Sequence, residues 1–395
     1  MSVFTSRPAM RWLVPTAAAA VLIGGGAAIG ALAASADPVL PPRSAEQLLV
    51  DLQTAEVDGM SGTVVHRAEL GLPTALTLAG KVGAGEGLGS LIDGTQTLRV
   101  WYAGPDQARL ALVRTLGETD VIRNGRDVWV WSSQQQGATH FTLPEGDDTG
   151  AEVTPEAYVT PQAAADQALA AIDESTEVSV GRSAEIAGRT AYELILTPRA
   201  EESLVGEIRI AIDSVEYVPL RFAVYPAGAD RAAVETSFTQ VSFERPDAEQ
   251  FVFNPPPGTT VTEAGEGDGP DGIGRRPDGT RPDADQDATA MEEFTKSWAD
   301  SDDAVRTVGS GWASVLVVTP PAEVTDGAPE AAAGDSPTAA EALDLLGDLP
   351  EVSGTWGSGR LLSSTLLTVL VTDDGRVFAG AVAAERLYEV ATETR

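Results

Sequence analysis

A long succession of short segments with alternating side chains, ended by Gly, Pro, Asn or Asp, constrains this fold more than any other feature. Such segments are typical of β-strands, and the turn residues between them favour hairpins and meanders, which pair antiparallel. We expect strands at residues 62–68, 96–103, 108–116, 120–124, 127–132, 139–143, 177–181, 191–197, 206–213, 220–225, 234–244 and 251–253. The pattern predicts an antiparallel sheet.

Two helices accompany these strands. Ser44-Ala45-Glu46-Gln47 is a capping-box pattern, and the leucines that follow it predict an amphipathic helix that ends at about Val57. A second helix is expected from Thr160-Pro161 to Ile172, because Pro is favoured at the first helical position. The fold class is therefore α+β.

The first 36 residues are expected to form an export leader. Arg7 and Arg11 precede an apolar run from Trp12 to about Ala34, and Ala34-Ser35-Ala36 matches an A-x-A cleavage site. The run is also long enough for a retained membrane anchor. Both alternatives place the rest of the chain outside the cytoplasm, either secreted or anchored to the outer face of the cytoplasmic membrane.

Composition excludes several classes of function. The 395-residue chain has a formal net charge of −33, so it repels nucleic-acid phosphates and anionic lipid headgroups. It has no cysteine, which excludes disulfides, thiolate chemistry and acylation at a lipobox. Its two histidines, His66 and His140, are too few for a three-histidine metal site.

The chain divides into several parts beyond the leader. Residues 37–43 form a Pro-rich spacer, and residues 44–263 form the strand-rich domain. Residues 264–290 are rich in Gly, Asp and Pro and predict a disordered linker. Residues 291–395 predict a small α+β unit, and we expect the whole protein to be a monomer.

Within this smaller unit we expect strands at 311–318, 359–371 and 376–382. Asp373-Asp374-Gly375 predicts a hairpin between the last two strands. Helices are expected after Ser336-Pro337 and from about Ala384.

No catalytic motif emerges. Gly80-Lys81 is followed by Val82 in place of Ser or Thr, so it is not a P-loop, and no G-x-S-x-G or H-E-x-x-H motif occurs. Asp283-x-Asp285-x-Asp287 resembles a calcium loop, but Ala288 and Phe294 stand where Gly and a bidentate Glu are needed. We expect no metal, no cofactor, no catalytic residue and no enzymatic activity.

The aromatic residues are more informative. Trp129 and Trp131 share one face of a predicted strand, and Val128 and Val130 share the other. Two interpretations stay open for such a strand: a sheet covered by helices on both faces, or a curved sheet with one face on a lipid-filled cavity. The other aromatic candidates for that lining are Trp101, Phe222, Tyr225 and Phe238.

Four motifs in order resemble the LolA/LppX/RseB superfamily of lipoprotein and lipid carriers. Residues 122–131 resemble its D-G-x-x-x-W-x-Y hairpin, with Asn124 in place of Asp and Trp131 in place of Tyr. The other three motifs are Gly104 to Arg109, resembling P-x-x-x-R; Ile212-Asp213 with Pro219-Leu220, resembling I-D…P-L; and Phe251 to Gly258, resembling F-x-F-x-P-P-x-G. The whole chain resembles the actinobacterial LolA-like branch.

The resemblance implies a curved, incomplete antiparallel β-barrel whose covering helices enclose an apolar cavity. The lining predicted for it comprises Trp101, Trp129, Trp131, Phe222 and Phe238. The Gly- and Leu-rich stretch from Leu70 to Gly94 has no steady period, and we predict that it is a lid. Its apolar contacts would be Leu72, Leu76, Leu78, Leu88 and Leu91.

Two functions follow from the resemblance. The first is a non-enzymatic carrier outside the cytoplasm that binds an acylated lipoprotein or a lipid. The second is an RseB-like envelope-stress sensor that binds an anti-sigma or other membrane-protein partner. An enzyme is the third alternative.

Overall fold

The computed structural model describes residues 40–72, 93–114, 117–143, 160–264, 305–319 and 349–394. The leader of residues 1–36, nearly all of the predicted linker and the helix expected after Ser336-Pro337 lie outside these residues. The same is true of four of the five predicted lid leucines, Leu76, Leu78, Leu88 and Leu91. The predictions for those segments stay predictions.

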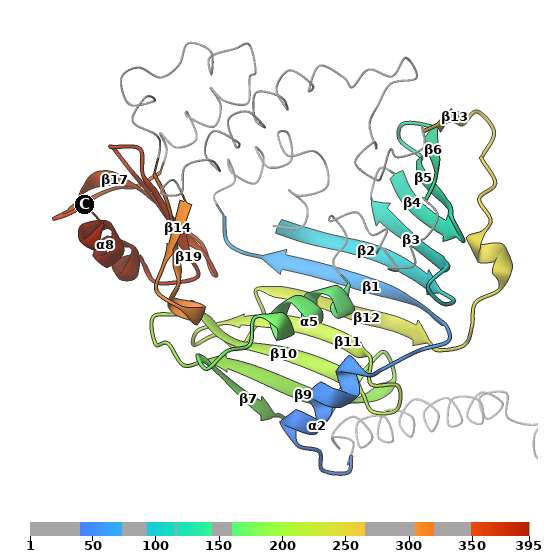
Figure 1. The fold of residues 1–395 in the computed structure, drawn as a ribbon, viewed down its shortest axis with the longest axis horizontal. Helices are drawn as coiled ribbons and strands as arrows, with labels where there is room; N and C mark the ends of the chain where they lie inside the picture. Colours follow the sequence, from blue (N-terminus) through green and yellow to red (C-terminus); the bar gives the residue numbers. More distant parts are fainter. Residues whose placement is uncertain are drawn as a thin grey trace, which may run out of the picture.

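Most described residues of the first part form one open sheet of 13 strands (Figure 1). The strand order is β13-β6-β5-β4-β3-β2-β1-β12-β11-β10-β9-β7, with β8 paired to β9, and the two ends of the sheet do not meet. The strands are β1 Met60–Glu69, β2 Asp93–Tyr102, β3 Gln107–Arg114, β4 Gly117–Asn124, β5 Asp127–Ser132, β6 Gly137–Thr142, β7 Thr176–Val180, β8 Ala184–Ile186, β9 Arg189–Pro198, β10 Val205–Asp213, β11 Pro219–Pro226, β12 Val234–Ser242 and β13 Thr260–Glu263.

Local sequence explains much of this sheet. The β4–β5 hairpin turns through Gly125 and Arg126, between the paired Asn124 and Asp127, and Gly125 has a φ of 65°, which glycine adopts without strain. The predicted bounds of β5 are confirmed. The sheet is an open, mostly antiparallel one, as the fold prediction requires, but β13 pairs with β6 in parallel and was not predicted.

Helices α2 Ala45–Gln53 and α5 Pro161–Ala170 lie on the same side of the sheet, over its β9–β12 part (Figure 1). The predicted capping box is confirmed: the Gln47 amide donates to Ser44 Oγ over 3.3 Å, and the Ser44 amide donates to Gln47 Oε1 over 3.0 Å. The helix ends at Gln53, before the predicted Val57.

A second sheet of six strands lies in the C-terminal part, in the order β14-β15-β19-β18-β17-β16. Its elements are β14 Val305–Val308, η5 Gly311–Ala313, β15 Val315–Val318, β16 Glu351–Gly354, β17 Gly357–Ser363, β18 Thr368–Thr372, β19 Val377–Gly380 and α8 Ala384–Glu393. The predicted hairpin at Asp373-Asp374-Gly375 and the predicted helix from Ala384 are both confirmed. Helix α8 packs on β18 and β19 and buries Leu387, Val390 and Ala391.

Three sequence predictions about strands are wrong. Residues 251–253 do not form a strand, because Phe251 ends the 3₁₀ helix η3 Ala248–Phe251 and is buried. Residues 311–318 begin with the 3₁₀ turn η5, so only the second half is a strand. The predicted strand 359–371 is two strands, since Ser364 and Leu367 close a turn in which the Ser364 amide donates to the Leu367 carbonyl over 2.8 Å.

The C-terminal sheet is bonded to the first sheet through main-chain atoms. The Leu204 amide donates to the Ala381 carbonyl over 2.8 Å, and the Ala383 amide donates to the Glu202 carbonyl over 3.0 Å. Trp312 Nε1 donates to Thr176 Oγ1 over 2.8 Å, and its ring packs against the core beneath α2 and α5. The two sheets are therefore docked on each other along the described residues.

The segment between β12 and β13 passes over one face of the first sheet. Arg245 Nη2 donates to the Ala103 carbonyl over 2.7 Å, and Arg109 Nη1 donates to the Gln250 carbonyl over 3.4 Å. The Phe253 ring lies 4.9 Å from the ring of Trp129 on β5. We call residues 245–259 the crossing segment.

Candidate functional site

The first face of the sheet, here called the apolar face, carries rows of aliphatic side chains across the strands. Val64 pairs with Leu98, and Leu98 pairs with Leu112. In the next row Val121 pairs with Val130. All five side chains are at most 8% exposed, so they form one continuous core surface over β1 to β5.

The apolar face continues into the other half of the sheet. Phe238 pairs with Val64, and across β11 and β10 the row runs from Phe222 to Ile210 and then to Leu194 on β9. Here α2 contributes Leu48 and Leu52, and α5 contributes Ala164 and Ala165 to the same cluster. Among the helices that the structure describes, α2 and α5 lie over β9–β12, and Figure 1 places neither over β2–β6.

Polar side chains lie at one end of the apolar face. His66 pairs with Gln96 on β2 and with Thr236 on β12, and its Nδ1 lies 2.8 Å from Thr236 Oγ1. Gln96 Nε2 is buried and has no hydrogen-bond partner in the described structure. A buried amide donor without a partner costs about 1–3 kcal/mol, so a ligand oxygen that reached it would remove a penalty.

The opposite face, here called the tryptophan face, carries aromatic and charged side chains. Trp101 pairs with Arg109, Arg109 with Ile122, and Ile122 with Trp129. The Arg109 guanidinium lies 5.1 Å from the centre of the Trp101 ring. Trp129 stacks on His140, with ring centroids 4.2 Å apart.

Asp120 is a buried carboxylate on the tryptophan face. It forms an ion pair with Arg109, yet its Oδ1 has no hydrogen-bond partner in the part of the chain described. Burial raises the pKa of Asp120 to about 6, against the lowering by Arg109, and nearby Glu118 adds to the rise.

His140 ties the sheet edge to β13. Its Nδ1 lies 2.7 Å from Glu263 Oε2 and its Nε2 lies 3.1 Å from Asp127 Oδ1. Since a carboxylate only accepts hydrogen bonds, both contacts are hydrogen bonds only when both ring nitrogens carry protons. This arrangement links β13, β6 and β5.

The structure does not bring the five predicted lining residues together. Trp101, Trp129 and Trp131 lie on the tryptophan face, while Phe222 and Phe238 lie on the apolar face with Val64. Tyr225 also lies on the tryptophan face, where the Arg209 guanidinium is 4.7 Å from its ring. Their predicted role in binding a ligand stays a prediction, and the two groups cannot line one cavity.

Of the five predicted lid leucines, only Leu72 lies in the described residues, and it is half-buried. In those residues, no group of three or more His, Cys, Asp and Glu side chains is placed to hold a metal ion. Within the same ranges, every helix is too short or too polar to cross a membrane.

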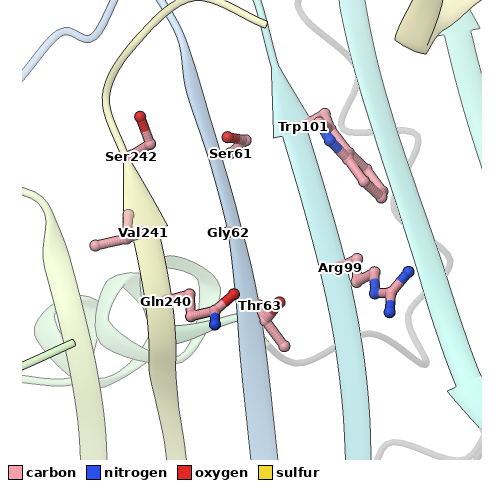
Figure 2. Close-up of a pocket in the computed structure, with 8 residues that line it drawn as sticks. All are labelled: Ser61, Gly62, Thr63, Arg99, Trp101, Gln240, Val241 and Ser242. Atoms are coloured by element: carbon pink, nitrogen blue, oxygen red, sulfur yellow. The ribbon is translucent and has the colours of Figure 1, made fainter.

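Sequence reasoning missed one group of residues. Ser61, Thr63, Arg99 and Gln240 gather at a cavity on the tryptophan face, together with Trp101 (Figure 2). They come from β1, β2 and the distant β12, and polar residues at alternate positions of half-exposed strands are ordinary. Only the strand register brings them together.

Comparisons with known proteins give structural likenesses alone, because no model of a protein family matches and no curated protein matches. One chain in the complex structure of MucA and MucB from Pseudomonas aeruginosa is 14% identical to this chain. The match has a TM-score of 0.38 and covers 88% of this chain and 96% of that one. An uncharacterised conserved protein from Thermus thermophilus is 11% identical, with a TM-score of 0.31, over 56% and 99%.

A LolA superfamily protein from Nitrosomonas europaea is 11% identical, with a TM-score of 0.21, over 54% of this chain and 99% of that one. The name of this neighbour is that of a superfamily which the four sequence motifs resemble, and the actinobacterial branch stays a prediction. With every TM-score below 0.5, the likenesses assign no activity to this chain.

Proposed function

We propose that the chain is an exported, non-enzymatic binding protein that carries an acylated lipoprotein or a lipid. The acyl chain lies along the apolar face over β2–β6, and the polar end of the ligand lies at the His66–Gln96 row. The observation that carries this proposal is the row of aliphatic side chains that ends at a buried amide donor with no partner in the described residues.

The energetics favour such a ligand. Burying an acyl chain gains about 0.8 kcal/mol per CH₂, so a chain of about sixteen carbons gains on the order of 12 kcal/mol. An oxygen of an ester, amide or hydroxyl group accepts a hydrogen bond from Gln96 Nε2 and sets the direction of the ligand. The chemistry required is burial and orientation, and it needs no catalytic group.

Native mass spectrometry of the leaderless protein tests the proposal, because bound lipid adds its mass to the folded chain. Leu110 lies on the apolar face of β3, where Val100 and Val121 flank it, and it is only partly buried. Leu110→Trp should fill the space above β3 and lower lipid occupancy at least about tenfold.

Val113→Trp is the matched control, since Val113 is partly exposed on the same strand and points to the tryptophan face. Circular dichroism checks that both variants fold. Protein that carries no lipid after exposure to vesicles, or equal occupancy in the two variants, contradicts the proposal.

A second proposal, ligand sensing, is supported by the docking of the C-terminal sheet. The bonds from Leu204 and Ala383 join that sheet to the loop between β9 and β10, beside the core under α2 and α5. A ligand that shifts this core would change those bonds, and a membrane-protein partner on the C-terminal sheet would respond. The sensor proposal requires that lipid binding change the hydrogen bonds of the Leu204 and Ala383 amides.

Hydrogen exchange measures this coupling directly. The Leu204 and Ala383 amides should change protection by at least about threefold when lipid binds, because both donate across the junction. The Leu361 amide, which donates to Pro350 within the C-terminal part, serves as the control. If lipid binds and the two junction amides keep their protection, the sensor is excluded and the carrier proposal stands.

A further inference from the structure

A cavity of about 420 Å³ lies on the tryptophan face, where β12, β1 and β2 run side by side (Figure 2). Ligand sites of roughly 300–1,000 Å³ are common in proteins, so its size suits a small organic molecule. The cavity opens on the face opposite to the one that we propose for the acyl chain.

The register sets its polar lining as two rows of three side chains. In the first row Ser242 pairs with Ser61, and Ser61 pairs with Trp101. In the second row Gln240 pairs with Thr63, and Thr63 pairs with Arg99. Side chains that pair across neighbouring strands stand about 5 Å apart, so the six groups face the cavity side by side from three strands.

A bulge shapes the floor of the cavity. The register shifts between Thr63 and Val64, and the Thr239 hydroxyl donates to the Thr63 carbonyl over 3.2 Å. A Cβ at Gly62 would lie 2.5 Å from the Gln240 carbonyl oxygen and 2.8 Å from the Phe238 ring, so only glycine fits. The close approach of β1 and β12 therefore depends on Gly62.

Most donors of this cavity are unused among the described residues. There the Arg99 guanidinium has no carboxylate or hydrogen-bond partner, although acids outnumber bases 59 to 26 in the chain. The side chains of Ser61, Thr63 and Gln240 also have no partner in those residues. Ser242 is engaged, since its hydroxyl accepts from the Glu244 amide over 3.2 Å.

The lining lacks negative charge. Its residues are one arginine, one tryptophan, three hydroxyl residues, one glutamine, one valine and one glycine. A free guanidinium beside hydroxyl and amide donors suits an anion with several oxygen acceptors, above all a phosphate group. The cavity is larger than a phosphate, and Trp101 and the hydroxyls remain for an attached polyol.

We propose that this cavity binds the phosphate ester of a small polyol. The phosphate oxygens pair with Arg99 and accept from Gln240 and Thr63, while the polyol lies against Trp101 and Ser61. This site is independent of the lipid-binding proposal, because the sheet separates the two faces.

Isothermal titration of the leaderless protein with sn-glycerol 3-phosphate tests the site, with inorganic phosphate and glycerol as comparison ligands. We expect saturable binding that is tighter for glycerol 3-phosphate than for phosphate and absent for glycerol. Arg99→Gln should weaken binding at least about tenfold, because it removes the charge-assisted hydrogen bonds. The variant should melt at the wild-type temperature, since Arg99 loses no bond to a described residue.

Arg67→Gln is the matched control. Arg67 lies on β1 on the same face, its guanidinium is 4.0 Å from Glu235 Oε1, and it is outside the cavity lining. It makes the same change in net charge and should leave the affinity within about twofold. Equal weakening by both variants, or no saturable binding of any phosphate, overturns the proposal.

Vesicles of phosphatidylglycerol separate the two sources of this chemistry. If binding to vesicles depends on Arg99, the ligand is a lipid headgroup at a membrane surface. If glycerol 3-phosphate binds through Arg99 and vesicles do not, the ligand is a free polyol phosphate. Both results support the site. Neither depends on the outcome for the apolar face, where native mass spectrometry would detect the added mass of a bound lipid.

Discussion

Two buried aspartates, one in each half of the sheet, each face an arginine, yet their pKa values shift in opposite directions. Asp213 ends β10 and is 1% exposed, and Asp120 lies within β4 and is 2% exposed. The pKa of Asp213 is lowered, whereas the pKa of Asp120 is raised to about 6. An arginine partner alone therefore does not decide the charge of a buried carboxyl group.

The number of hydrogen bonds to each carboxylate explains the difference. Burial by itself would raise the pKa of Asp213, but three groups donate to it: Arg189 Nη2 over 2.9 Å, the Val215 amide over 2.9 Å and the Glu216 amide over 2.8 Å. Asp120 accepts from Arg109, its Oδ1 has no donor in the described residues, and nearby Glu118 raises its pKa further. The turn after β10 therefore supplies backbone N–H donors that stabilise the charged form of Asp213, and Asp120 within β4 has no such donors among the described residues.

The largest effect is expected from Asp213→Ala. The variant leaves Arg189 and the turn amides of Val215 and Glu216 without an acceptor, at a cost of about 3 kcal/mol at pH 7. Because the folded pKa of Asp213 is lowered, its contribution is present above about pH 4 and is lost as the pH falls. Urea denaturation should therefore show a smaller deficit at pH 3 than at pH 7; equal deficits would contradict this.

A smaller effect of opposite sign is expected from Asp120→Asn. With a folded pKa of about 6, Asp120 keeps its proton in the folded chain while the unfolded chain loses it near pH 4. Wild-type stability should fall relative to the variant by on the order of 2 kcal/mol between pH 4 and 7. If the free energy of unfolding of the two proteins changes equally between pH 4 and 7, the pKa of Asp120 is not raised, and the effect of Arg109 on that pKa outweighs the effect of burial.

The smallest effect is expected from Trp131→Phe. Trp131 pairs with Asp120 across β4 and β5, and its indole Nε1 is buried without a partner in the residues described. Removal of an unpartnered donor offsets part of the lost packing, so stability should change by less than about 1 kcal/mol. An NMR titration should give an unchanged pKa for Asp120, whereas a rise would reveal an indole hydrogen bond in solution.

Local pattern predicted the fold where each element carries its own signal. Alternation was enough for β5, and the capping box was enough for the start of α2. The strand β13 was missed because Thr260–Glu263 is short and polar, and its pairing depends on β6, far away in sequence. Residues 251–253 alternate like a strand, but Phe251 is held by packing on the tryptophan face.

The site was less predictable, for a geometric reason. A period of two places Trp129 and Trp131 on one face and Val128 and Val130 on the other, and the register confirms that separation. It does not say which face the helices cover, because both faces of β5 are apolar. The cavity around Arg99 depends on the pairing of β1 with β2 and β12, which no local motif encodes.

The crossing segment has a mechanical consequence. It leaves β12 near the middle of the sheet, is held by Arg245 and Arg109 on the way, and ends as β13 beyond β6. Neighbouring strands are about 4.8 Å apart, so the covalent chain ties together points separated by roughly 34 Å along the sheet. Because this tie lies on the tryptophan face, it joins the β6 edge to the middle of the sheet without covering the side chains of the apolar face.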